Sequence, residues 1–262
     1  MPAQGWAGER DLAAEGKTID ALGQFELKTV LGPIGHSVGF TQSSAHMLLA
    51  VGLITLLVMY GISRQAVVPG RLQSLTESAY EFIQGLVIGQ VGPEGKRFFP
   101  FVFSLFMFIL FGNLLGLLPF AFTFTSHIVV TFALAAIVFV LITVVALMLH
   151  GKKFFGYFFP EGAPIWLAPI IIPVEIVSYL SRPISLSIRL FANMVAGHVM
   201  LKVFATFIVL LGGLGVAGPF IAVLPLTVNV ALVGFEILVA FLQAYVFAIL
   251  TSIYLHDAVH LH

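Results

Sequence analysis

Five long apolar runs constrain this chain more than any other feature of its sequence. They cover approximately residues 44–62, 98–122, 128–149, 163–211 and 219–255. A helix needs about 20 apolar residues to cross a hydrocarbon layer of roughly 30 Å, and even the first run is just long enough. The runs therefore predict an all-α integral membrane protein built from transmembrane helices.

The composition agrees with a membrane location. Hydrophobic residues make up 60% and charged residues 9% of the 262 residues, whereas soluble domains carry about 25% charged residues. The mean hydropathy is +1.08. Twelve basic and twelve acidic residues balance one another, so nothing indicates nucleic acid as a partner. The chain has no cysteine, which excludes disulfides and thiolate metal sites.

Charges beside the apolar runs predict how the chain crosses the membrane. Arg64 and Arg71 follow the first run, and Lys152 and Lys153 follow the third. Basic loops favour the cytoplasmic side, so the N-terminus is expected outside and the C-terminus inside. The predicted division is a polar segment 1–43 on the outer side, a first transmembrane helix 44–63, a cytoplasmic segment 64–97, a transmembrane helix pair 98–151 and a helical hairpin 152–262.

Residues 72–91 differ from the five runs. Polar residues such as Glu77 and Glu81 alternate there with Leu, Tyr and Phe. This pattern predicts an amphipathic helix lying in the membrane interface. The alternative is a helix within a soluble loop.

The second run contains Gly112 and Gly116 at small-xxx-small spacing, with Asn113 beside the first glycine. Small residues at this spacing let helices approach closely, and a buried amide can hydrogen-bond a neighbouring helix. We expect Asn113 to be such an anchor rather than part of a substrate pocket.

The last two runs are too long for one perpendicular crossing. Residues 163–211 would form a helix of about 70 Å, more than twice the hydrocarbon thickness. Pro173 and Pro183 permit bends but do not force them. The helix must therefore break or lie strongly tilted, and residues 219–255 pose the same problem. We expect a long, strongly tilted C-terminal helical hairpin.

Arg189 stands inside the first of these long runs. A guanidinium does not lose its proton, and in the bilayer centre it costs about 2.5–3.5 kcal/mol on insertion scales. Such a residue needs a carboxylate partner or a wet cavity and marks a functional site by default. The alternative is an Arg whose side chain reaches a lipid headgroup.

Helical spacing gathers other polar residues around Arg189. At 100° per residue they fall within about 40° of it, along roughly 27 Å of helix axis. His198 falls on the opposite side, about 180° from Arg189. The members of this polar stripe are Glu175, Ser178, Arg182, Ser185 and Asn193.

The last run carries a second polar file. Asn229, Glu236 and Gln243 recur at seven-residue spacing, within about 40° of one another. Carboxylates, histidines and amides in file inside a membrane are typical of proton paths. We expect a two-way proton relay between Glu236 and His198. The alternative is that these polar groups only hydrogen-bond neighbouring helices.

The chain end carries two more histidines. His256 and His260 are four residues apart, a spacing that suits a metal ligand pair. No third ligand is in view, so neither a metal nor another cofactor is expected.

These motifs resemble a known family. Its signature is matched by Arg189-Leu190-Phe191-Ala192-Asn193-Met194 followed by Ala196-Gly197-His198, by Glu175, by Glu236 and Gln243-Ala244-Tyr245-Val246-Phe247, and by Gly112-Asn113-Leu114-Leu115-Gly116-Leu117-Leu118-Pro119. The resemblance is to subunit a of the membrane sector of the rotary F-type ATP synthase. It covers about two-thirds of the chain.

The resemblance implies a stator proton channel that performs no bond chemistry itself. Arg189 would face the carboxylate of the rotating c-ring. The outer half-channel would hold Asn193, His198, Glu236 and Gln243. The inner half-channel would hold Glu175, with Ser178 and Ser185 on the same stripe. The implied partners are the c-ring, the b-type subunits of the peripheral stalk, protons and the lipid bilayer.

One exchange of residues refines the resemblance. Many bacterial relatives carry a carboxylate where His198 stands and a histidine where Glu236 stands. The reverse arrangement here is similar to mitochondrial-type members, which implies an alphaproteobacterial inner membrane, or a mitochondrial inner membrane if the chain is organellar.

Two other function classes fit parts of the pattern. A secondary transporter could bind an anionic solute at Arg189, but it predicts paired repeats with broken helices. A haem-binding respiratory subunit needs histidine pairs deep within spans, and only His198 is clearly deep.

Overall fold

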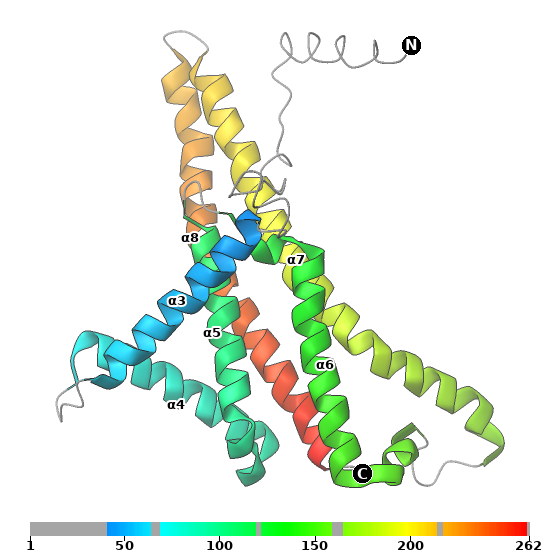
Figure 1. Cartoon of the computed structure of the whole chain (residues 1–262). Coiled ribbons are helices and arrows are strands. Elements are labelled where there is room, and N and C mark those ends of the chain that lie inside the picture. Colours follow the sequence, from blue (N-terminus) through cyan, green and yellow to red (C-terminus); the bar gives the residue numbers. More distant parts are fainter. Residues whose placement is uncertain (1–40, 64–68, 119–121, 159–164, 214–216, 261–262) are drawn as a thin grey trace, which may run out of the picture. The chain divides into compact units, whose positions relative to one another are not determined.

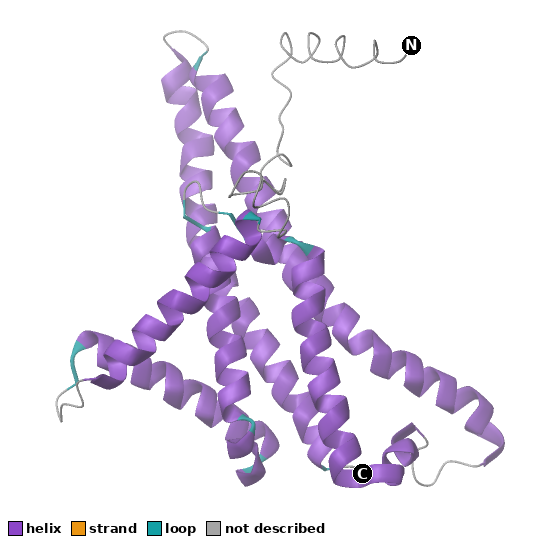
Figure 2. Ribbon diagram, in the orientation of Figure 1, coloured by secondary structure: helices purple, strands orange, loops and turns teal. Residues whose placement is uncertain are grey.

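A computed structural model describes residues 41–63, 69–118, 122–158, 165–213 and 217–260. Within these ranges the regular elements are α-helices and short 3-10 helices, and there is no β-strand (Figures 1 and 2). Nearly all of the predicted polar segment 1–43 lies outside the described residues, as does Arg64. The described α-helices are α3 (Gln42–Ser63), α4 (Arg71–Val91), α5 (Phe99–Gly116), α6 (Ile128–His150), α7 (Ala168–Gly212) and α8 (Gly218–Val259).

Helices α3, α5, α6, α7 and α8 are long and apolar enough to cross a membrane. Each coincides with one of the five apolar runs of the sequence, so the predicted all-α membrane class is confirmed. Short 3-10 helices connect them: η2 (Pro93–Arg97), η3 (Phe124–Ser126), η4 (Gly151–Phe158) and η5 (Ile165–Leu167). The predicted domain division and the orientation of the termini stay predictions.

The amphipathic segment forms a helix as predicted. On α4 the buried residues are Thr76, Ile83, Val87 and Val91. They are spaced by seven residues and then twice by four, which places them on one helical face. Glu77 and Glu81 lie on exposed positions. One apolar face therefore packs against the protein while the charged face is left outside.

The second run ends earlier than predicted. Helix α5 stops at Gly116 rather than near residue 122. The following segment folds back, and the Thr123 hydroxyl donates a hydrogen bond of 3.3 Å to the Gly116 carbonyl. That bond satisfies one of the carbonyls that a helix end leaves without an intrahelical partner. The prediction of a span reaching 122 was wrong at this end.

The two glycines of α5 serve a different contact from the one predicted. A Cβ added to Gly112 would overlap the ring of Phe124, and one added to Gly116 would overlap Thr123. The nearest neighbours of this glycine face therefore belong to the segment around η3 and not to another helix. The small residues make room for a buried connection instead of a helix pair.

Helix α7 runs through 45 residues without a break, although it contains Pro173 and Pro183. Helix α8 has 42 residues and contains Pro225. Breaking a helix in lipid would free several backbone groups that have no water to bind, whereas a proline removes only one donor. The sequence length left two possibilities, a broken helix or a strongly tilted one, and the unbroken α7 excludes the break. At ~1.5 Å per residue α7 is about 68 Å long.

The described chain divides into two compact units. One contains residues 196–234, which are the end of α7 and the start of α8. Where α8 begins, a Cβ added to Gly218 would lie 2.7 Å from the carbonyl oxygens of Leu211 and Gly212. Only a residue without a side chain lets the two helices of this hairpin meet so closely at its tip.

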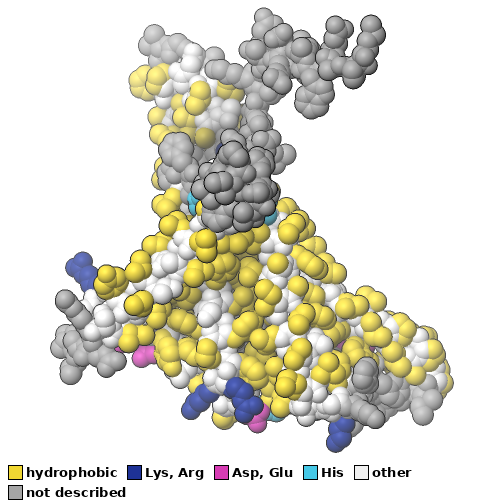
Figure 3. All heavy atoms as spheres, in the orientation of Figure 1, with side chains coloured by type: hydrophobic (Ala, Val, Ile, Leu, Met, Phe, Trp, Pro, Cys, Tyr) yellow, Lys and Arg dark blue, Asp and Glu magenta, His cyan; other side chains and the backbone are white. Residues whose placement is uncertain are grey.

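The other unit contains the described residues up to 195 and those from 235 onward. Its core joins buried side chains from α4, α5, α6, α7 and α8. Thr131 of α6 contacts Ser187 of α7 at 3.1 Å, and Thr143 contacts Tyr179 at 2.7 Å, so the two helices run antiparallel. The visible face of this unit is mainly apolar, with most charged side chains at its margins (Figure 3).

Candidate functional site

The polar stripe of α7 lies on the side of the helix that the chain leaves uncovered. The side of the helix next to the stripe, about 60–160° from Arg189 at 100° per residue, is packed into the core through Tyr179, Pro183, Leu186, Ser187, Leu190 and Met194. Ser178, Ser185 and Arg189 are exposed, while Glu175 and Asn193 are partly covered. On the unbroken helix α7 the residues predicted to share a face with Arg189 do share one, and Arg182 differs from the others only because its side chain has a partner within the chain.

Arg189 itself has no ion pair among the described residues. Its neighbours Ile184 and Ile188 are each 49% exposed. A guanidinium on a membrane helix needs a carboxylate partner, a wet cavity or a lipid headgroup. None of the described residues forms an ion pair with Arg189.

The polar residues of α8 are placed differently. Glu236 and Gln243 are buried, with 4% and 6% of their surfaces exposed. They lie one heptad apart on an unbroken helix. Asn229 belongs to the other unit, and its amide oxygen is buried without a hydrogen-bond partner among the described residues. A buried amide oxygen of this kind is costly unless water or another group reaches it.

A buried amide on α5 holds α8 between Glu236 and Gln243. The Asn113 side chain donates to the Ala240 carbonyl at 3.3 Å and accepts a hydrogen bond of 2.9 Å from the Thr125 hydroxyl. Asn113 and Thr125 are both fully buried. The predicted role of Asn113 as an interhelical anchor is confirmed. Thr125 was not identifiable from the sequence, because a threonine in a connection has no helical spacing to single it out.

His198 is half-buried in the unit of residues 196–234, with Lys202 one turn further along α7. Glu236 belongs to the other unit. The proton relay predicted between these two side chains stays a prediction.

An ion pair escaped the sequence reasoning. Arg182 of the polar stripe pairs with Asp257 near the end of α8, at 3.2 Å. The Arg182 guanidinium also lies over the rings of Tyr179 and Tyr254. The only available signal was a single acidic residue close to the C-terminus, which spacing alone cannot assign to a partner.

The two C-terminal histidines stack on each other. The rings of His256 and His260 are 4.7 Å apart at 28°. Within the described residues no group of three or more His, Cys, Asp or Glu side chains could hold a metal ion.

Comparisons with known proteins agree with these motifs. The family model described as ATP synthase A chain matches residues 44–256. An ATP synthase subunit a from Granulibacter bethesdensis is 66% identical over 252 residues, which are 96% of this chain and 100% of that protein. The subunits of the same name from Gluconacetobacter diazotrophicus and Acidiphilium cryptum are 58% and 56% identical, covering 94% and 95% of this chain and 99% and 100% of theirs. The chain therefore belongs to the ATP synthase subunit a family.

Proposed function

We propose that this chain is the stator proton channel of a rotary ATP synthase. Two offset half-channels load and unload the carboxylate of each c-ring subunit, and proton flow through them drives ring rotation and ATP synthesis. The observation that supports this most is Arg189, an exposed cation on a membrane-spanning helix whose adjacent side is packed into the core. Family membership supports the same assignment.

Arg189 acts as the gate between the two half-channels. Its fixed positive charge attracts an ionised rotor carboxylate and repels a proton, so the two paths do not join. Once protonated, the carboxyl group is neutral and can move into lipid at a far lower cost than a charge. Each proton that crosses 100 mV supplies about 2.3 kcal/mol, so a leak past Arg189 dissipates the drive directly.

The inner half-channel uses the exposed stripe of α7. Glu175, Ser178 and Ser185 lie on the same face as Arg189 on an unbroken helix. At ~1.5 Å per residue, Glu175 is about 21 Å from Arg189 along the helix axis, most of the way to one membrane surface. A carboxylate and two hydroxyls on an open face can exchange protons with water that enters from that side.

The outer half-channel uses Asn193, His198, Glu236 and Gln243. Glu236 and Gln243 are buried on α8, and the anchor at Asn113 fixes the helix between them. A buried carboxylate in a membrane helix needs a task or a partner, and a carboxyl and an imidazole are both groups that can take up and release a proton.

The assembled enzyme supplies the missing surfaces. We propose that the c-ring covers the exposed stripe of α7 and that b-type stalk subunits and lipid cover the remaining apolar helices. Helix α3 is the barest of the candidate spans in the first half of the chain, with 11% of its apolar window buried. In a bacterium the complex sits in the inner membrane, with the N-terminus of this chain outside, its C-terminus inside and residues 152–262 forming the proton-path domain.

Replacing Arg189 tests the proposal. In membrane vesicles, Arg189→Ala should abolish proton-driven ATP synthesis and ATP-driven acidification while the amount of assembled complex stays normal. Arg97→Ala is a matched control, because Arg97 is exposed in η2 outside the candidate spans. Retained ATP synthesis in Arg189→Ala would overturn the proposed function.

A further inference from the structure

Arg182 poses a problem for any cation gate at Arg189. The two residues are seven positions apart on one unbroken helix, so they face within about 20° of each other and lie roughly 10 Å apart along the axis. A guanidinium cannot lose its proton to escape the membrane interior. A rotor carboxylate attracted to this face of α7 would therefore encounter two cations.

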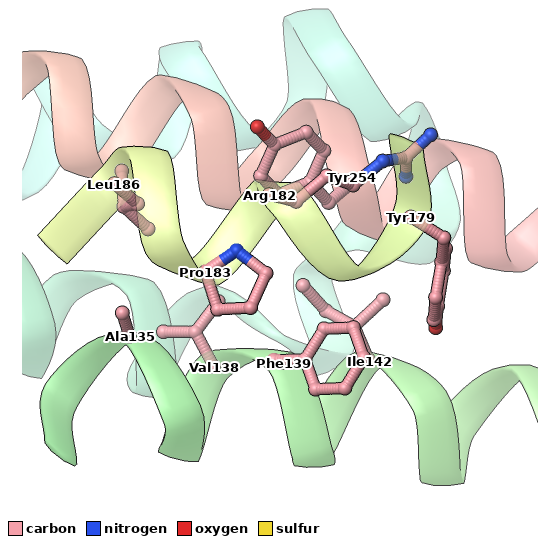
Figure 4. Close-up of a pocket in the computed structure, with 9 residues that line it drawn as sticks. All are labelled: Ala135, Val138, Phe139, Ile142, Tyr179, Arg182, Pro183, Leu186 and Tyr254. Atoms are coloured by element: carbon pink, nitrogen blue, oxygen red, sulfur yellow. The ribbon is translucent and has the colours of Figure 1, made fainter. Parts of the chain in front are cut away.

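The structure holds the charge of Arg182 inside the chain. Its Nη1 donates to Asp257 Oδ2 at 3.2 Å. The centre of the guanidinium lies 4.9 Å from the ring centroid of Tyr254 and 5.4 Å from that of Tyr179. Figure 4 shows Arg182 on α7 extending toward Tyr254 of α8, with Tyr179 one turn away. The side chains of Arg182 and Asp257 are 20% and 33% exposed. Arg189, by contrast, is exposed and forms no ion pair with any of the described residues.

Helix α6 fixes the groups that hold Arg182. The Tyr179 hydroxyl shares a hydrogen bond of 2.7 Å with Thr143 of α6. The His150 ring, at the end of α6, donates to the Ala258 carbonyl at 3.1 Å, next to Asp257. Three helices therefore meet around one guanidinium, and bonds from α6 hold the Tyr179 ring and the backbone next to Asp257.

We propose that Asp257, with Tyr179 and Tyr254, neutralises Arg182 so that Arg189 alone attracts the rotor carboxylate. This inference rests on the proposed function of Arg189. Asp257 and the tyrosines are positioning residues, since they act on the rotor only through Arg182. The competing explanation is a purely structural latch between α7 and α8.

The inference predicts that Asp257→Asn releases a competing cation. Two unit charges 10 Å apart at an effective dielectric constant of 20 interact strongly enough to change a rate about tenfold. We therefore expect Asp257→Asn to assemble and to synthesise ATP about tenfold more slowly per assembled complex. Asp257→Glu and the control Glu94→Gln, an exposed acid of η2, should stay within about twofold of the parent by the same reasoning.

The double variant Arg182→Gln/Asp257→Asn separates charge from structure. If Arg182 is a competing cation, removing it should restore ATP synthesis to within about twofold of the parent, because the neutral pair presents no charge. A structural latch predicts a double variant at least as slow as Asp257→Asn, and that result would overturn the inference. If Asp257→Asn does not accumulate, Arg182→Gln alone decides, since the charge model expects near-parent rates and the latch model a loss.

The outcome is distinct from failure of the proposed function. Retained ATP synthesis in Arg189→Ala would overturn the proposed role of Arg189 as the gate, whatever the rate of Asp257→Asn. An inactive Arg189→Ala variant together with a fully active Asp257→Asn variant would leave the gate in place and overturn only the neutralisation of Arg182.

Discussion

The anchor at Asn113 gives a prediction whose size follows from the structure. Asn113→Ala removes two hydrogen bonds, one to Ala240 and one from Thr125. Hydrogen bonds between membrane helices average about 0.6 kcal/mol each, so the pair contributes about 1.2 kcal/mol. The Thr125 hydroxyl is fully buried and would lose its acceptor, which costs a further 1–3 kcal/mol or so. The Ala240 carbonyl is within α8 and keeps a partner in its own helix.

The total is therefore about 2–4 kcal/mol of destabilisation. For a chain of this size, 1 kcal/mol lowers the midpoint of thermal unfolding by roughly 2–4 °C, so Asn113→Ala should lower it by about 4–16 °C. The assay is the temperature at which the detergent-solubilised complex loses this subunit, followed on native gels. Thr55→Val is the matched control, because Thr55 is exposed and its hydroxyl donates a hydrogen bond to the Val51 carbonyl of its own helix.

A double-mutant cycle sharpens the prediction. Thr125→Val leaves the Asn113 amide oxygen without its donor, whereas Asn113→Ala/Thr125→Val removes both polar groups. Removing both partners costs less than the sum of the single losses, because no buried group is then orphaned. The double variant should be at least 1 kcal/mol or so more stable than additivity expects. Strict additivity would show that the two side chains do not share a hydrogen bond and would refute the contribution of Thr125 to the anchor.

Two further predictions concern proton-accepting groups. His127 precedes α6 with its ring stacked on Phe122 at 5.1 Å and its Nε2 buried without a hydrogen-bond partner among the described residues. Burial lowers the pKa of His127, so the unfolded segment binds more protons than the folded one, and local stability should fall as the pH drops below about 6.5. Amide exchange itself slows on acidification, so the readout is the protection of residues 122–130 relative to the intrinsic exchange rate. This protection should fall on acidification in the parent but not in His127→Phe, and an equal fall in both would contradict the assignment. Glu236→Gln should slow proton-driven ATP synthesis more than it lowers the amount of assembled complex, and unaltered passive proton flux through vesicles stripped of the catalytic sector would count against its place in the outer path.

The helices of this protein were predictable because lipid imposes a simple rule. A chain in hydrocarbon must satisfy its backbone hydrogen bonds within each segment, so run length and hydrophobicity identify helices directly. The five apolar runs and the amphipathic segment 72–91 all became helices. The end of α5 was not predictable, since residues 117–122 are apolar and only the Thr123 contact at Gly116 shows where the chain turns back.

The polar stripe was also within reach of the sequence. A fixed helical period places Glu175, Ser185 and Arg189 on one face once the helix is known to be unbroken. The period does not tell which of two equivalent arginines is paired. Arg182 and Arg189 are seven residues apart on the same helical face, so the helical period treats them alike. Only the packing of α8 against α7 brings Asp257 to Arg182.

The sequence by itself determined the class of the protein, the approximate positions of its helices and the polar residues that share a helical face, because these depend on local hydrophobicity and helical periodicity. Tertiary structure alone decided which groups meet across the chain: Asn113 with Thr125 and Ala240, Gly112 with Phe124, and Arg182 with Asp257. Contacts between residues more than a helix apart in the chain depend on how whole helices pack, and no local pattern records that arrangement.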